Sequence, residues 1–102
     1  MPFPVVFIDP QGEQLRVNTA ARALDARLGA ADWRDFRMLD PDTLLPIPHE
    51  QRPVTRVLRG ETVPPFEAVS EAPSGERIPV LLYEAPVIID GKLAAGVAVI
   101  DI

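Results

Sequence analysis

The last quarter of the chain contains the pattern that most restricts the fold. Residues 77–89 (RIPVLLYEAPVII) and residues 92–102 (KLAAGVAVIDI) are two runs rich in β-forming residues. Only Asp90-Gly91 lies between them, a two-residue connection typical of a tight β-hairpin. Pro79 and Pro86 are expected to break the first run. The second run is rich in small residues, as is common in a central strand that faces a packed helix.

The first part of the chain predicts a second hairpin followed by a helix. Residues 5–8 form a short apolar strand, and residues 14–17 alternate between polar and apolar as a half-buried strand does. The intervening Asp-Pro-Gln-Gly has the residue preferences of a type I turn. Asn18 is a preferred N-cap, and apolar residues recur at helical spacing over residues 19–28.

The middle of the chain is less regular. Asp40-Pro41-Asp42 favours a turn, so we expect residues 33–47 to form a loose hairpin or an irregular loop. Residues 50–59 are expected to form a short helix with a proline in its first turn and a glycine after its end. Residues 62–71 are expected to form a strand, in which Pro64-Pro65 indicates an edge position or a bulge.

The predicted order is therefore β-β-α-(loop)-α-β-β-β, in one domain. Its 102 residues are enough to bury one modest core. Because the strands are connected mostly by hairpins, we expect an antiparallel sheet with its helices on one face, which is an α+β domain.

Composition excludes several classes of function. The net charge is -5 and the basic residues are scattered, so we expect no contact with nucleic acid, which normally binds a basic patch. Arg52, Arg56 and Arg59 form the one local group, either a partner surface or a solvated helix face. The absence of cysteine excludes disulfides and cysteine catalysis, and a single histidine excludes a multi-histidine zinc site within one chain. No apolar run approaches the ~18 residues of a membrane span, so no direct membrane contact is expected.

Three segments, in this order and at this spacing, resemble the PAS (sensory box) family. VVFIDPQGEQLRVNTAARAL is similar to the family's opening strand, D-x-x-G turn, second strand and Ala-rich helix after an Asn. PVTRVLRGETV looks like the family's F helix and its exit into the next strand. APVIIDGKLAAGVAVIDI is similar to the strand-D-G-strand pattern that ends many PAS domains, although the chain stops before the threonine of the family's Asp-Ile-Thr. Residues 30–47 have no clear match.

The resemblance implies a five-stranded antiparallel sheet in the order 2-1-5-4-3, with short helices that close a pocket. It also implies a role in bacterial signal transduction: the domain senses a small ligand or mediates homodimerisation, and relays its state to a C-terminal output module. We expect residues 1–102 to be a single PAS domain excised from a larger cytoplasmic signalling protein, with a histidine kinase as the favoured parent. No catalytic activity of the domain itself is expected.

His49 is the first candidate for cofactor binding. By resemblance, it falls about where oxygen-sensing PAS domains carry the proximal histidine of haem, and a neutral imidazole can bind iron. However, TVPPFEAVSE lacks the basic residue that those sensors use on the following strand. We therefore favour the interpretation that His49 is exposed or caps a short helix, and that no cofactor is bound.

Other residues are candidates for a ligand pocket or a relay. Trp33 could contact a flavin, although packing is the favoured role, and the cysteine of light-sensing PAS domains is absent. Phe66, Tyr83 and Val99 are candidates for the pocket-facing side of the sheet, with plain core packing as the alternative. Asp101 matches the aspartate of the terminal Asp-Ile-Thr motif, which in the family couples the last strand to the output helix.

A small α+β enzyme is the rival from another class of protein. Such an enzyme would need a carboxylate or histidine that is buried in the cavity and has a shifted pKa. Most acidic residues here lie at expected turns, among them Asp9, Asp40, Asp42 and Asp90, where they have structural roles.

Overall fold

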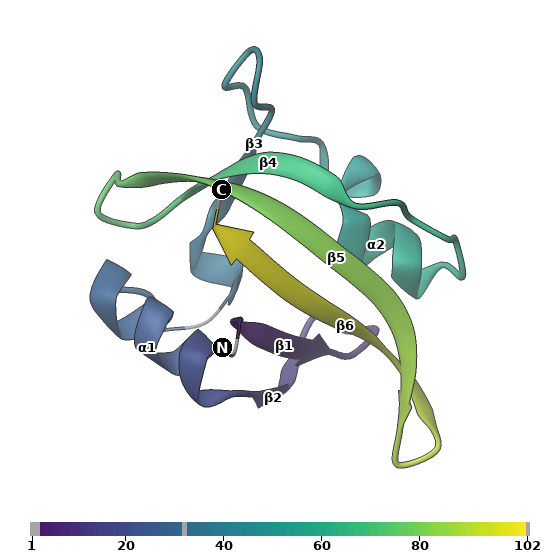
Figure 1. Cartoon of the computed structure of the whole chain (residues 1–102). Coiled ribbons are helices and arrows are strands. Elements are labelled where there is room, and N and C mark those ends of the chain that lie inside the picture. Colours follow the sequence, from purple (N-terminus) through teal and green to yellow (C-terminus); the bar gives the residue numbers. More distant parts are fainter. Residues whose placement is uncertain (1–2, 32, 102) are drawn as a thin grey trace.

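A single curled antiparallel sheet forms most of the domain (Figure 1). The computed structural model describes residues 3–31 and 33–101, apart from the side chain of Asp101. The sheet order is β2-β1-β6-β5-β4-β3. Its strands are β1 (Val5–Ile8), β2 (Gln14–Val17), β3 (Arg37–Leu39), β4 (Phe66–Glu71), β5 (Arg77–Ile89) and β6 (Lys92–Asp101). The helical segments are α1 (Thr19–Leu28), α2 (Pro53–Leu58) and two 3-10 turns, η1 (Trp33–Asp35) and η2 (His49–Gln51).

The sheet has six strands rather than the expected five, because residues 37–39 add β3 at one edge. The other five strands lie in the predicted order. A loose hairpin does follow β3: the amide of Ile47 donates to the carbonyl of Met38, and that of Asp40 donates to the carbonyl of Leu45. Asp40 also stabilises the turn, since its side chain accepts from the amides of Asp42 and Thr43.

An acidic side chain on β4 ties the added edge strand to the rest of the sheet. Glu71 pairs with Arg77 of β5 at 2.9 Å and with Arg37 of β3 at 3.0 Å. The hydrogen bond from Arg77, helped by Arg37, lowers the pKa of Glu71. These ion pairs therefore help to keep β3 paired with β4, although a strand of three residues forms few backbone hydrogen bonds.

Prolines also shorten the predicted elements of the middle segment. Pro53 forces the preceding residue, Arg52, into an extended conformation with φ -68° and ψ 139°, so the expected helix over 50–59 divides into η2 and α2. The expected strand over 62–71 begins only at Phe66, because Pro64 and Pro65 have no amide to donate.

The prediction that Pro79 and Pro86 break the long run was wrong, since β5 is continuous over 13 residues. Pro79 lies where β5 pairs with β4 but not yet with β6, and Pro86 lies where it pairs with β6 alone. At each proline one side of the strand has no partner, so the missing amide costs no ladder hydrogen bond there. The turn at Asp90-Gly91 is confirmed, with φ of 50° and 77° as a type I′ turn requires.

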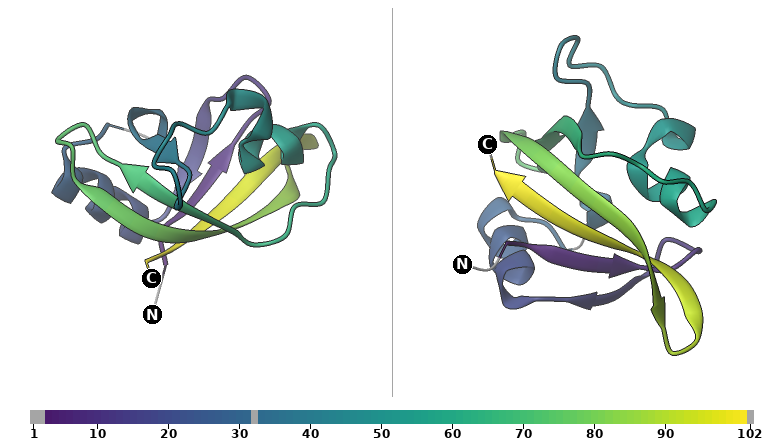
Figure 2. Two further views of the ribbon diagram at one scale, coloured as in Figure 1. Left: turned by 90° about the horizontal axis from the view of Figure 1, so that it is seen from above. Right: turned by 45° about the vertical axis from the view of Figure 1, so that its right-hand side comes forward.

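The helical segments cover the concave face of the sheet (Figure 2). α2 packs on β5 and β6, where the fully buried Val57 contacts Ala95 and Val63. Ala95 has no exposed surface and lies in the same buried cluster as Val57, which confirms that a small residue of β6 allows a helix to approach. The main core contains Val6, Ile8, Ala21, Val80 and Leu82.

Asn18 joins the first strand to the first helix. Its side-chain Oδ1 accepts from the amide of Ala21, which is the predicted N-cap of α1. The same oxygen accepts from the amide of Val5 at 3.0 Å, and Nδ2 donates to the carbonyl of Phe3 at 2.7 Å. One amide group thus fixes where α1 starts relative to β1.

We predict that Asn18→Ala lowers the free energy of unfolding by about 2 kcal/mol, since it removes the cap and leaves a strand amide without its acceptor. Asn18→Asp keeps the accepting oxygen and should cost less. Urea denaturation of the three proteins checks this. Equal midpoints for Asn18→Ala and the unchanged protein would contradict this role.

Candidate functional site

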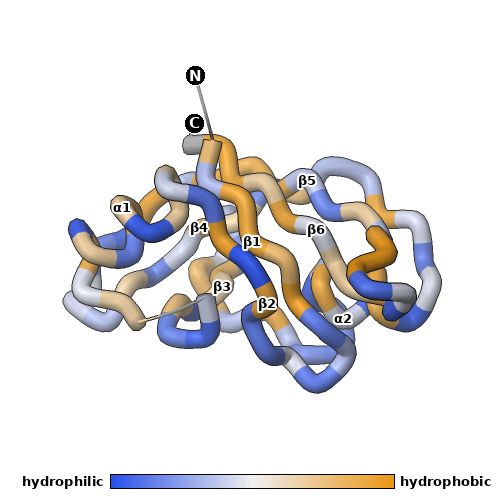
Figure 3. Tube along the Cα trace, turned by 90° about the horizontal axis from the view of Figure 1, so that it is seen from below, coloured by the Kyte–Doolittle hydropathy of each residue, from blue (hydrophilic) through white to orange (hydrophobic). Residues whose placement is uncertain are grey.

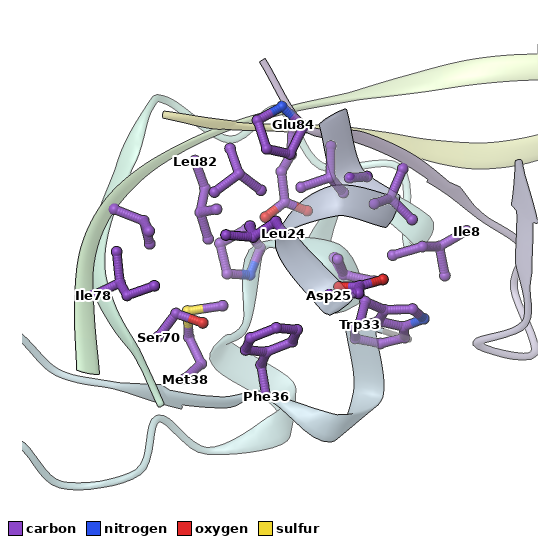
Figure 4. Close-up of a pocket in the computed structure, with 18 of the residues that line it drawn as sticks. Ile8, Leu24, Asp25, Trp33, Phe36, Met38, Ser70, Ile78, Leu82 and Glu84 are labelled. Carbon is purple, nitrogen blue, oxygen red and sulfur yellow. The ribbon is translucent and has the colours of Figure 1, made fainter. Parts of the chain in front are cut away.

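A cavity of about 250 Å³ lies between the concave face of the sheet and the segments that cover it (Figure 4). Its sheet side is formed by inward-facing residues of β1, β3, β4, β5 and β6. The opposite side consists of α1, η1, the segment before α2 and the start of α2. Most of the lining is apolar, so the space suits a small hydrophobic molecule.

Strand alternation determines which side chains of the sheet reach the cavity. β5 contributes Ile78, Val80, Leu82 and Glu84, every second residue of that strand. Their neighbours in sequence point to the outer face, because successive side chains of a strand lie on opposite sides. Val97 and Val99 of β6 follow the same rule.

Trp33 forms part of the opposite wall. Its indole Nε1 donates to the carbonyl of Gly12 at 3.2 Å, which ties η1 to the turn between β1 and β2. The guanidinium carbon of Arg52 lies 5.6 Å from the centre of the indole ring, within the range of a cation–π contact. Trp33 of η1 thus contacts Arg52, the residue that precedes α2.

Glu84 is an acidic side chain inside this apolar cavity (Figure 4). Its Oε1 atom is buried and has no hydrogen-bond partner among the described residues. Burial disfavours the charged form and raises the pKa of Glu84 to about 8, although the positive charge of Arg52 opposes this shift. Near neutral pH the group is therefore mostly protonated.

Arg52 is the cation that lines the same cavity. Burial lowers the pKa of its guanidinium, and the nearby Glu84 partly offsets this. Among the described residues no carboxylate forms an ion pair with Arg52, although Arg56 and Arg59 both pair with Glu61. Arg52 therefore differs in its contacts from Arg56 and Arg59, with which the sequence analysis grouped it.

Two of the sequence-predicted residues line the cavity and three do not. Trp33 and Val99 line it, although ligand binding by either stays a prediction. His49 is exposed on η2, outside the lining. Phe66 instead packs against the main core. The expectation that Tyr83 faces the cavity was wrong: its side chain is 45% exposed, because the phase of β5 turns Glu84 inward instead.

The sequence reasoning missed Arg52 and Glu84. The sequence did contain a signal for Glu84. It follows Ile78, Val80 and Leu82 at every second position of one strand, so its side chain faces the same side of the sheet. Arg52 carried no comparable signal, because the extended residue before Pro53 follows no helical spacing. Asp101 is the last residue of β6 and its backbone pairs with Val80, but its side chain lies outside the described parts.

Haem and flavin do not fit this site. Both are several times larger than the roughly ten non-hydrogen atoms that a cavity of this volume holds. His49 does not reach the cavity to ligate iron. The described residues contain no cluster of three side chains that could hold a metal ion. None of the helices in the described ranges has the length and apolarity that a membrane crossing requires.

Glu84 generates a prediction about stability and pH. Its folded pKa of about 8 lies above the ordinary value of 4.5, so the folded state holds a proton that the unfolded state has lost between these two pH values. The free energy of unfolding should therefore fall by up to about 1.4 kcal/mol per pH unit across this window, relative to Glu84→Gln.

Urea denaturation of both proteins at pH values from 5 to 9 measures this difference. The two curves of stability against pH should diverge as the pH rises and become parallel above pH 8. Parallel curves throughout would show that Glu84 titrates normally.

Comparison with known proteins agrees with this architecture. No protein-family model matches the sequence, and no curated protein matches it. A solved structure, the PAS domain of an HTR-like protein from Haloarcula marismortui, superimposes with a TM-score of 0.62 at 20% sequence identity. The match covers 99% of this chain and 82% of that one. Together with the sheet order and the covering helices, it shows that this chain has the fold of a PAS domain.

Proposed function

We propose that this domain is the sensory module of a signalling protein, and that it binds a small apolar molecule in the cavity between the sheet and the helical segments. The observation that carries this proposal is an apolar cavity lined by two polar groups, Arg52 and Glu84, that do not form an ion pair with each other. Ligand sites commonly combine an apolar lining with a few polar groups that orient the ligand.

A route for the relay runs along β6. Val97 and Val99 line the cavity, and Asp101 ends the same strand two residues later. The amide of Val99 donates to the carbonyl of Pro4, so the beginning and the end of the described chain lie beside each other. We propose that ligand occupancy shifts β6 and is read by a C-terminal module, with a cytoplasmic histidine kinase as the favoured parent. Resemblance alone supports that choice.

Dimerisation is proposed as a second activity of the domain. The outer face of the sheet carries Leu81, Tyr83 and Ala85 on β5 beside Ile100, Ala98 and Gly96 on β6. β1 runs beside β6 in the sheet, and both strands are largely hydrophobic (Figure 3). A second copy of this chain could cover such an apolar face.

A cavity enzyme remains the rival function, and Glu84 favours it. A buried carboxyl group with a raised pKa can act as a general acid or base near neutral pH. The described part of the cavity holds no histidine, and its one serine is Ser70. We therefore place ligand binding first, and an enzyme would show itself by chemical change of the bound molecule under mass spectrometry.

We predict that octan-1-ol, a neutral apolar probe of suitable size, binds the unchanged protein and that Val99→Phe weakens this binding at least about tenfold, because a phenyl ring occupies the space. Isothermal titration calorimetry measures both affinities.

Ile100→Phe is the matched control. It adds the same ring one residue later on the same strand, where the side chain lies on the outer face, so binding should persist. Equal affinities for the Val99 and Ile100 variants would show that the probe does not enter the cavity.

For dimerisation, we predict that sedimentation velocity shows a concentration-dependent dimer that Tyr83→Glu converts to monomer, because a carboxylate would be buried in an apolar interface. Tyr83→Phe keeps the ring and should keep the dimer. A monomer at all soluble concentrations of the unchanged protein would refute the interface.

A further inference from the structure

We infer that the cavity recognises a small apolar monocarboxylate, whose carboxylate group is held between the guanidinium of Arg52 and the carboxyl group of Glu84. This inference rests on the proposed ligand-binding function and names the chemical class of the ligand. It follows from the charges in the cavity, the unsatisfied atom of Glu84 and the size of the space.

Arg52 supplies the positive charge. The indole of Trp33 holds its guanidinium at the cavity wall. Glu84 lies near enough to act on its charge, but no carboxylate among the described residues forms an ion pair with it. Because the guanidinium is partly desolvated and has no ion-pair partner, an anion that enters the cavity gains from this charge. Guanidinium groups also match the two oxygens of a carboxylate in geometry.

Glu84 supplies a hydrogen-bond donor in its protonated form. Its Oε1 atom is buried and has no hydrogen-bond partner among the described residues. Burial keeps the proton on Glu84 near neutral pH, since its pKa is raised to about 8. A protonated carboxyl group can donate to one oxygen of a ligand carboxylate while accepting at its own second oxygen.

The other lining residues determine the body of the ligand. Three charged side chains line the cavity among the described residues, namely Asp25 of α1, Arg52 and Glu84. Asp25 already has an interaction partner, so it is not available as a free acceptor. The remaining lining is almost wholly apolar. An apolar cavity of about 150 Å³ holds benzene, so about 250 Å³ suits a chain or ring compound of roughly ten non-hydrogen atoms.

Other head groups fit these charges less well. An ammonium group would meet the like charge of Arg52. An alcohol or a primary amide can form hydrogen bonds with both residues but leaves the positive charge of Arg52 without compensation. A carboxylate satisfies the cation and the proton donor together.

The experiment compares four probes with the same alkyl chain and different head groups: octanoate, octanamide, octan-1-ol and octylamine. Isothermal titration calorimetry of the full chain at about pH 6.5 gives their affinities. We expect octanoate to bind at least about tenfold more tightly than octan-1-ol, as for a charge-assisted contact that replaces a neutral one. Octylamine should bind most weakly.

The pH dependence of octanoate binding adds a second readout. The anion requires protonated Glu84, so its affinity should be constant from about pH 6 to 7 and fall about tenfold per pH unit above pH 8. Glu84→Gln has no proton to lose and should remove this fall.

Variants of arginine test the cation. Arg52→Met keeps an unbranched side chain and should weaken octanoate at least about tenfold more than it weakens octan-1-ol. Continued binding of octan-1-ol shows that the variant is folded. Arg56→Met is the matched control, because Arg56 pairs with Glu61 away from the cavity. It should leave both probes unchanged.

The outcomes separate the two proposals. If octan-1-ol binds and octanoate binds no more tightly, the carboxylate inference is wrong and the ligand-binding function stands. If octanamide binds best and its affinity rises with pH, ionised Glu84 accepts from the ligand and the inference is likewise overturned. If no probe binds the unchanged protein, the proposed ligand-binding function itself fails.

Discussion

The register between β5 and β6 determines which side chains face the cavity and which lie on the outer face of the sheet. The two strands pair from Val80 with Asp101 to Ile89 with Lys92, and a two-residue turn fixes that alignment. A shift of one residue would turn Tyr83 inward and move Glu84 to the outer face. The apolar cavity, its acidic group and the exposed aromatic on the other side of the sheet all follow from one turn.

The sequence predicted most strongly where local chemistry determines structure. The strands over 5–8 and 14–17, the helix over 19–28 with its Asn18 cap, and the hairpin at Asp90-Gly91 are all confirmed. In each case a turn residue, a cap or a clear periodicity decides the conformation without help from distant contacts. The α+β class follows from these elements and is confirmed. The order of the five predicted strands is also confirmed, but the resemblance to PAS domains implied it and local chemistry did not.

Most of the contacts that build the site could not be predicted from local sequence patterns. β3 has only three residues, which are too few to show an alternating pattern. The ion pair that supports its pairing joins Arg37 to Glu71, which lies more than 30 residues away in sequence. Pro79 and Pro86 are tolerated only because of where neighbouring strands end. Arg52 reaches the cavity because Pro53 extends the backbone before α2. These outcomes depend on tertiary geometry, whereas the inward position of Glu84 was readable from strand phase.

The two walls of the cavity differ in how they are built. The sheet wall consists mostly of strands paired on both sides, whereas the opposite wall includes the single turn η1 and the six-residue α2. Short elements separate from a core at a small fraction of the cost of global unfolding. The wall of short elements can therefore open locally while the sheet stays intact, so the two walls of one cavity differ in local stability.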